Sequence, residues 1–315
     1  MLLNLTYLVG GLVLLSWSAD RFIAAAASLV RHWGVAPMLV GVFVLGVGTS
    51  APEIAVSINA ALRGAPDIAL GNAVGSNITN LGLVLGICAL VKALPVSSSA
   101  LRTEFPAVLT VSVLLLLICV DDRFSRWEGW SLLGLFVGVM AWLVWRSGHT
   151  APDDPLLAEI QQHQQAELPL KAALLWLLFG LVCLPLSAEL FVRGASAIAR
   201  DLGVSELVIG LSIVALGTSL PELAASLSSA LRGEVDLAMG NLLGSNLFNA
   251  LIVFGIPGAW SSLSLEPEML RRDLPWMLGL SLGVYLLARW RTRIGRLGGG
   301  LLLGSYGSYL FILAS

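Results

Sequence analysis

Apolar residues fill long runs of this chain, and short polar stretches separate the runs. Ten of the runs come close to the roughly 20 residues that a helix needs to cross a bilayer. The pattern therefore predicts an all-α integral membrane protein with ten transmembrane helices. We expect these helices at residues 2–30, 36–62, 68–92, 105–121, 127–146, 171–200, 205–231, 237–260, 273–290 and 297–314.

The composition strengthens this interpretation. Of the 315 residues, 57% are hydrophobic and 12% are charged, whereas a soluble domain carries about 25% charged residues. We expect a multi-pass protein of the cell (inner) membrane, surrounded by the lipid bilayer. Because no basic run is interleaved with aromatic residues, we expect no nucleic-acid partner. No obligatory protein partner and no prosthetic cofactor are evident either.

The second half of the chain repeats the first half. Glu222 follows Glu53 by 169 residues, and Asn249 follows Asn80 by the same 169. At this offset, and without a gap, roughly 29 of about 70 positions from Trp17 to Gly86 are identical. We expect a first five-helix repeat at 1–146, a hydrophilic linker at 147–170 and a second five-helix repeat at 171–315. An odd number of helices per repeat makes the two repeats inverted, with a substrate site near the membrane midplane between them.

Lysine and arginine residues in the short loops predict the orientation, because such residues accumulate on the cytoplasmic side. Under the ten-helix model one side carries the larger set: Arg31, Lys92, Arg102, Arg146, Lys171, Arg232, Arg289, Arg291, Arg293 and Arg296. The opposite side carries Arg63, Arg123, Arg126, Arg200, Arg271 and Arg272. The majority predicts that both termini lie outside the cytoplasm.

A short polar phrase interrupts the second apolar run, and its repeat interrupts the seventh. The phrase is G-T-S-A-P-E at 48–53 and G-T-S-L-P-E at 217–222. Pro52 has no backbone N–H, so we expect a kink in the helix there. A carboxylate at this depth is costly in lipid and usually serves function. Thr49, Ser50 and Glu53, with Thr218, Ser219 and Glu222, are therefore candidate site residues.

A second phrase, G-N-x-x-G-S-N-x-x-N, follows each copy at 71–80 and 240–249. Its polar residues recur every four positions and so share one helix face. These residues are Asn72, Ser76 and Asn80 in the first repeat and Asn241, Ser245 and Asn249 in the second. The glycines of the phrase form a neighbouring stripe, which is typical of close helix packing.

Together the two repeats would gather two carboxylates with hydroxyl and amide oxygens. Hard cations such as Ca²⁺, Na⁺ and Mg²⁺ prefer such ligands, whereas softer metals prefer His or Cys, which these phrases lack. A protonated, purely structural pair of acids is the alternative. Asp20 and Glu189 are also repeat mates, but Arg193 stands four residues after Glu189, which favours a solvated ion pair there.

The doubled phrases resemble the two α-repeats of the calcium/cation antiporter superfamily, and within it the prokaryotic sodium/calcium exchanger type. The resemblance spans nearly the whole chain and implies the sodium/calcium exchanger fold. It implies an antiporter that exchanges Ca²⁺ for Na⁺ by alternating access, in which the helices at 2–30 and 171–200 slide against the core. Glu53 and Glu222 would bind both ions, and Thr49 and Thr218 would add oxygens to the Ca²⁺ site.

The resemblance further implies that Ser50, Ser219, Ser76 and Ser245 serve flanking Na⁺ sites, with Asn80 and Asn249 near the innermost position. One departure stands out: several members carry Asp where this chain has Asn249, which argues against K⁺ cotransport. Other interpretations remain: an H⁺-coupled antiporter for Ca²⁺ or another divalent cation, a passive cation channel, or a binding-only sensor. No Ser/His or metal-ligand group accompanies the acids, so we expect no enzyme.

Overall fold

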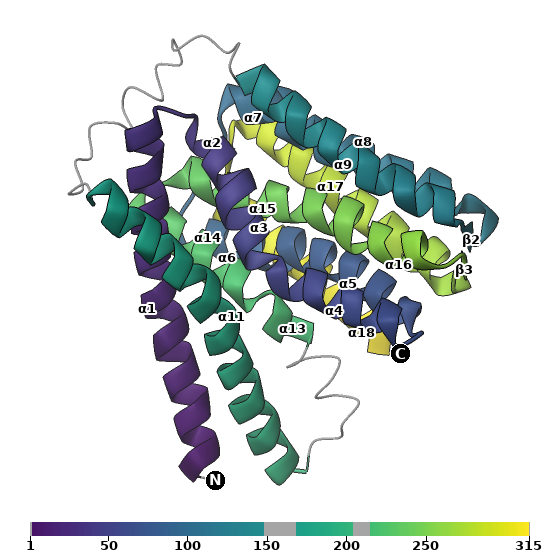
Figure 1. The fold of residues 1–315 in the computed structure, drawn as a ribbon, viewed down its shortest axis with the longest axis horizontal. Coiled ribbons are helices and arrows are strands. Elements are labelled where there is room, and N and C mark those ends of the chain that lie inside the picture. The colour runs from purple at the N-terminus through teal and green to yellow at the C-terminus, as the bar shows by residue number, and fades with distance from the viewer. Residues whose placement is uncertain (1, 148–167, 204–214, 315) are drawn as a thin grey trace.

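The computed structural model describes residues 2–147, 168–203 and 215–314. The first half consists almost entirely of helix, with π-helical segments η1 and η2, one 3₁₀ turn, η3, and two short strands (Figure 1). Its elements are α1 (Leu2–Trp33), α2 (Pro37–Val40), η1 (Gly41–Gly46), α3 (Val47–Thr49), α4 (Ala51–Leu62), α5 (Pro66–Thr79), η2 (Asn80–Val84), α6 (Leu85–Val91), β1 (Leu94–Pro95), α7 (Ser98–Arg102), α8 (Glu104–Ile118), η3 (Cys119–Asp121), β2 (Arg123–Phe124) and α9 (Arg126–Ser147).

The second half has a similar order of elements where it is described. Its elements are α11 (Leu170–Asp201), α13 (Ala215–Thr218), α14 (Leu220–Arg232), α15 (Val235–Phe248), the π-helix η5 (Asn249–Val253), α16 (Gly255–Trp260), β3 (Leu263–Ser264), the π-helix η6 (Met269–Asp273), α17 (Leu274–Arg291), β4 (Arg293–Ile294) and α18 (Arg296–Ala314). Most of the predicted linker 147–170 and the beginning of the predicted helix 205–231 lie outside the described residues.

The nearly all-helical prediction is confirmed, and each predicted span coincides with helical elements wherever the chain is described. Within that part, six helices are long and apolar enough to cross a membrane, and a bent pair, α2–α3 with α4, would make seven. The helices α17 and α18 are not among them. The number of ten membrane crossings therefore stays a prediction.

The predicted kink at the first proline phrase is present, as a break between two helices. Helix α3 ends at Thr49, α4 begins at Ala51, and the two meet at an angle of 46°. Ser50 lies between them with φ −84° and ψ 4°, and its repeat mate Ser219 has φ −90° and ψ 4°. In both repeats the proline falls in the first turn of the following helix, where the missing N–H has no helical acceptor to lose.

Four two-residue strands, which the hydrophobic pattern did not predict, join the repeats to each other. Strand β1 pairs with β4, and β2 pairs with β3, both antiparallel. Strands β1 and β3 occupy equivalent places in the two repeats, and so do β2 and β4. Exchanging the two repeats therefore converts the β1–β4 pair into the β2–β3 pair. Ser112 and Ser281, which are 169 residues apart, meet with their hydroxyl oxygens 3.4 Å apart, which places them at this pseudo-symmetry axis.

The long helices α1 and α11 form a pair of their own. They run side by side at a steep angle to the other long helices (Figure 1). Small residues permit their close approach: a Cβ on Gly11 would lie 2.5 Å from the backbone nitrogen of Phe191. Much of their apolar surface is exposed, as at Leu175 and Leu178, which suits contact with lipid.

Glycines also bring the α2–η1 segment onto α15. A Cβ on Gly240 would lie 2.5 Å from the carbonyl oxygen of Met38 and 2.9 Å from the Cα of Gly41. A Cβ on Gly244 would lie 2.7 Å from the Cα of Val42. This is the close packing that the glycine stripe predicts for the second repeat. For the mates Gly71 and Gly75, no described atom lies within 4 Å of such a Cβ.

Candidate cation site

The two phrase glutamates lie in the interior of the protein. The side chains of Glu53 and Glu222 are both 0% exposed, and they are close enough to repel each other electrostatically. Each stands in the first turn of the helix that follows the break. The positive end of a helix dipole faces this turn, which favours an anionic side chain. The broken helices therefore set two carboxylates at the contact between the repeats.

Hydroxyl groups from the first repeat reach into the second. The Ser50 hydroxyl donates to Glu222 Oε1 at 3.2 Å, and the Thr49 hydroxyl donates to Asn241 Oδ1 at 3.0 Å. The Thr49 and Ser245 hydroxyl oxygens lie 3.3 Å apart. A hydroxyl that donates its proton to a neighbour presents its lone pairs elsewhere. These contacts orient the oxygens of the first repeat around the acid of the second.

The asparagine stripe supports both broken helices in the same way. Asn72 Nδ2 donates to the backbone oxygen of Glu53 at 3.5 Å, and its mate Asn241 donates to the backbone oxygen of Glu222 at 3.5 Å. Asn241 Nδ2 also lies 2.9 Å from the Ser226 hydroxyl. Both amides thus hold the first turn of a glutamate-bearing helix. Asn72 and Asn241 therefore contact the glutamate residues through the backbone of those turns.

Several buried oxygens in this region have no hydrogen-bond donor. They are Glu53 Oε1 and Oε2, Glu222 Oε2, Ser219 Oγ, Asn80 Oδ1 and Asn249 Oδ1. Burying such a group without a partner is unfavourable, and for a carboxylate it is strongly so. A dehydrated cation would satisfy these oxygens. The donor set, with two carboxylates and otherwise neutral oxygens, fits a hard cation such as Ca²⁺ or Na⁺.

The remaining predicted residues, among them Ser76, Ser245 and Thr218, lie along the same elements. Ser76 is buried on α5, one turn before Asn80, and Ser245 is buried on α15. Thr218 is half-buried at the end of α13. Within the described residues, no group of three or more His, Cys, Asp or Glu side chains gathers, so any shell here would depend on hydroxyl and amide oxygens beside the two glutamates.

Sequence reasoning missed two side chains that take part in this network. Asn246 accepts a hydrogen bond from Asn80 Nδ2 at 3.3 Å, and Ser226 supports Asn241. Ser226 stands four residues after Glu222, so helical spacing alone could have found it. Asn246 lies off the four-residue stripe. It reaches Asn80 across the repeats, and only the packing of α5 near α15 reveals that contact.

The last asparagine of each second phrase begins a π-helical segment. Asn80 opens η2 and Asn249 opens η5, at equivalent positions of the two repeats. Short π-helical segments inside α-helices are frequent at functional sites. The wider turn changes the register of the residues beyond it. Helix periodicity in the sequence does not reveal such a segment.

The two sides of the cluster differ in exposure. Asn241 is fully buried under the α2–η1 segment, whereas its mate Asn72 is half-buried. Gly240 is buried and its mate Gly71 is exposed. The α2–η1 segment thus covers the cluster on the side of α15, and its repeat equivalent at 206–214 lies outside the described residues.

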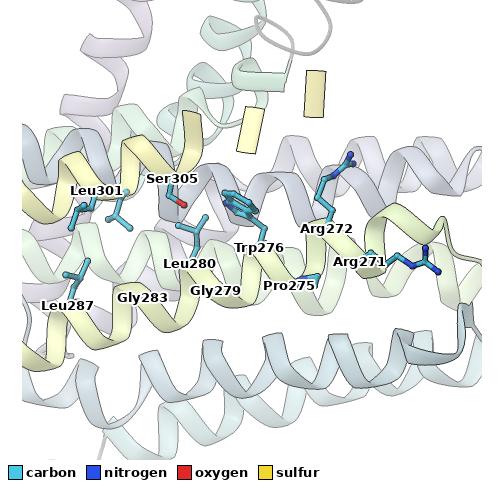
Figure 2. A pocket seen from close by; sticks show the side chains of 11 residues that line it. Arg271, Arg272, Pro275, Trp276, Gly279, Leu280, Gly283, Leu287, Leu301 and Ser305 are labelled. Atoms are coloured by element: carbon cyan, nitrogen blue, oxygen red, sulfur yellow. The ribbon is translucent and has the colours of Figure 1, made fainter. Parts of the chain in front are cut away.

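A separate pocket of about 590 Å³ lies between α17 and α18 (Figure 2). Its walls are mostly apolar, with Trp276 and Ser305 near its middle and Arg271 and Arg272 toward one end. None of the predicted site residues lines it. Arg272 forms an ion pair with Asp273, with Nε and Oδ1 2.6 Å apart. The positive charge of Arg272 in this pocket is therefore largely neutralised.

Charged residues near the helix ends form ion pairs. Arg193 and Glu189 pair within α11 at 2.7 Å, as the spacing predicted. Asp20 of α1 pairs with Arg232, at the end of α14, at 2.7 Å. Glu234, in the turn between α14 and α15, lies 3.7 Å from Arg31. Burial raises the pKa of Glu234 above its ordinary value, although Arg31 and Arg232 oppose this shift.

The sequence matches a known family over both repeats. A family model described as "Sodium/calcium exchanger protein" covers residues 3–145 and 172–314. The solved structure of the sodium-calcium exchanger NCX_Mj, soaked with zero Na⁺ and Ca²⁺, superimposes with a TM-score of 0.85 at 33% sequence identity. That match covers 99% of each chain. The sodium/calcium exchanger fold is thereby shown for this chain.

Two relatives match along their whole length. The "Putative antiporter CaxA" of Alkalimonas amylolytica is 43% identical over 319 residues, with 100% of both chains covered. The "Inner membrane protein YrbG" of Escherichia coli is 39% identical over 324 residues, covering 99% of this chain and 97% of the relative. The family model describes exchangers, which are membrane transporters. The chain belongs to the sodium/calcium exchanger family.

Proposed function

We propose that this protein is an antiporter that exchanges Ca²⁺ for Na⁺ across the cell membrane, and that Glu53 and Glu222 bind the competing cations. The observation that carries the proposal is the pair of fully buried carboxylates, three of whose four oxygens have no donor. Family membership supports calcium/cation antiport in general. The assignment to these two residues rests on their burial and on the hydroxyl and amide oxygens around them.

Charge balance gives the exchange a physical basis. Two buried carboxylates would leave two negative charges in a poorly solvated interior, which is costly. One Ca²⁺ neutralises both charges, and so do two Na⁺ ions. A conformational change that moves the site between the two sides should therefore proceed with cations bound and be slow without them. This is the condition for exchange rather than leak, and it fits alternating access between inverted repeats.

The neutral oxygens then define the flanking positions. We propose that Thr49 and Thr218 contribute to the Ca²⁺ site, and that Ser50, Ser76, Ser219 and Ser245 contribute to Na⁺ sites. Asn80 and Asn249 stand at the start of the π-helical segments, with unpartnered amide oxygens. Asn72 and Asn241 hold the glutamate-bearing turns in place. With an amide at Asn249 in place of an acid, the site carries one negative charge fewer, which disfavours K⁺ as a further substrate.

The same proposal fixes the organisation of the chain. Residues 1–146 and 171–315 form the two inverted repeats, and 147–170 joins them. Each strand pair joins two loops that the ten-helix model places on the same side of the membrane. The β1–β4 pair lies on one side and the β2–β3 pair on the other. We place the β1–β4 side, where the arginines are more numerous, in the cytoplasm and both termini outside it.

Ca²⁺ uptake into proteoliposomes tests the proposal. Purified protein is reconstituted, and Ca²⁺ uptake is followed under an outward Na⁺ gradient, an outward H⁺ gradient, or neither. We expect uptake with the Na⁺ gradient alone. Uptake only with the H⁺ gradient would reassign the protein to proton-coupled antiport, and uptake down a Ca²⁺ gradient with neither ion would make it a channel.

A further inference from the structure

The ion pair between Asp20 and Arg232 has no formed counterpart between the equivalent residues of the other repeat. Asp20 and Glu189 are repeat mates, and so are Arg63 and Arg232, each 169 residues apart. Asp20 lies 2.7 Å from Arg232 and links α1 to the end of α14. The equivalent link would join Glu189 to Arg63 at the other end of the bundle. Instead Glu189 pairs with Arg193 within α11, and Arg63 forms no ion pair with the described residues.

The packing of the helices shows the same asymmetry. Helix α1 packs along α14, whereas its mate α11 makes no comparable contact with α4. Two repeats with nearly the same local structure therefore dock in two different ways. In an inverted-repeat protein, exchanging the two docking modes generates a second conformation that opens toward the opposite side.

We infer that the ion pairs exchange with the conformation: Asp20–Arg232 holds the present one, and Glu189–Arg63 holds the other. This inference rests on the proposed alternating access, but not on which ions are transported. Each conformation then contains one ion pair that links a long sliding helix, α1 or α11, to the end of a glutamate-bearing helix, α14 or α4. In the other conformation α11 packs along α4, and α1 leaves α14.

The burial of these side chains is compatible with such an exchange. The pair that is formed is partly buried, with Arg232 21% exposed and Asp20 50% exposed. The pair within α11 is more exposed, with Arg193 67% and Glu189 56% exposed. A solvent-exposed pair four residues apart on one helix contributes little, so Glu189 can leave Arg193 at small cost.

The competing arginine makes the exchange unequal. The repeat mate of Arg193 is Ala24, so Asp20 has no equivalent partner within α1. Glu189 must give up a contact to reach Arg63, whereas Asp20 gives up none to reach Arg232. The present conformation is therefore the favoured one of the two, and removing Arg193 should favour the other.

Distances between spin labels in the full-length protein, in lipid nanodiscs, test the exchange. Cys88, Cys119 and Cys183 are first replaced, and labels are placed on pairs of exposed residues at the ends of the helices concerned. Leu62 and Leu202 report on α4 and α11, and their mates Leu231 and Trp33 report on α14 and α1. Na⁺-driven Ca²⁺ uptake by each labelled background shows separately whether the proposed transport function holds.

Three substitutions outside the cation site carry the prediction. Asp20→Asn should raise the share of molecules with a short Leu62–Leu202 distance by about fivefold, as expected for a partly buried pair, and Arg193→Ala should shift it in the same direction. Arg63→Gln should shift the population oppositely, toward a short Trp33–Leu231 distance. Equal effects of Asp20→Asn and Arg63→Gln, or no effect of either, would overturn the inference even if transport is confirmed.

Discussion

Replacing Gly240 with alanine is expected to disturb the cation site without touching any proposed ligand. Gly240 lies where α15 meets the α2–η1 segment, and an added Cβ would stand 2.5 Å from the carbonyl oxygen of Met38. That distance is 0.9 Å shorter than the 3.4 Å at which ordinary van der Waals contact begins. The other near atoms, in Gly41 and Val42, also belong to the backbone. No side-chain rotation can relieve the clash, so the segments must separate.

The separation acts on the hydrogen bond that Thr49 donates to Asn241. The bond is 3.0 Å long, and a displacement of 0.9 Å passed on in full would lengthen it beyond hydrogen-bonding range. Losing a neutral hydrogen bond costs about 1 kcal/mol, which corresponds to roughly a fivefold loss of affinity. Overpacking also lowers stability by about 1–3 kcal/mol. We therefore expect weaker Ca²⁺ binding together with a lower unfolding temperature.

Equilibrium Ca²⁺ binding and thermal unfolding in detergent measure both effects. The matched control is Gly71→Ala, because Gly71 is the repeat mate of Gly240 and its added Cβ meets no described atom within 4 Å. This control should keep the affinity of the unmodified protein and lose no stability, since alanine favours a helix over glycine. If Gly240→Ala matches Gly71→Ala in both measurements, the close packing of α15 does not position Thr49.

Further predictions concern single contacts. Ser50→Ala removes the hydroxyl that donates to Glu222 at 3.2 Å. Since a hydrogen bond to a charged group contributes about 1.5–3 kcal/mol, the Ca²⁺ affinity measured by calorimetry should fall at least tenfold. An unchanged affinity would refute the role of this contact. Glu234→Gln tests the raised pKa of Glu234, whose ionised form destabilises the fold as pH rises through that pKa. The substitution should raise the unfolding temperature at alkaline pH, and the gain should vanish below the ordinary pKa of 4.5; an equal gain at both pH values would contradict it.

The sequence was sufficient for the helical fold and its internal repeat because two periodic signals agree. Apolar runs of membrane-spanning length and the constant offset of 169 residues predict inverted helical repeats, and the pairing of Ser112 with Ser281 shows the two-fold relation in space. The kink at Ser50 also followed from local chemistry, since Pro52 cannot donate a backbone hydrogen bond. The strand pairs were out of reach, because two-residue strands have no hydrophobic period of their own.

The candidate site was predictable in its residue types but not in its contacts. The two phrases identified the hydroxyl and carboxylate side chains, yet they could not show that Ser50 reaches Glu222 across the repeats. The π-helical segment beginning at Asn80 was likewise hidden, because periodicity assumes a uniform helix. The unequal packing of α1 on α14 and of α11 on α4 has no signal in the sequence either, since the two repeats are so similar there.

The measurement that tests the central claim most directly is Ca²⁺ binding to purified protein in competition with Na⁺, compared with Glu53→Gln and Glu222→Gln. Glu104→Gln is the matched control, because Glu104 is a buried acid on α8 outside the cluster. We predict that Na⁺ displaces Ca²⁺ from the unmodified protein and from the control, and that neither site variant binds Ca²⁺ while both stay folded. Ca²⁺ binding of undiminished affinity in either site variant would contradict the shared-carboxylate site.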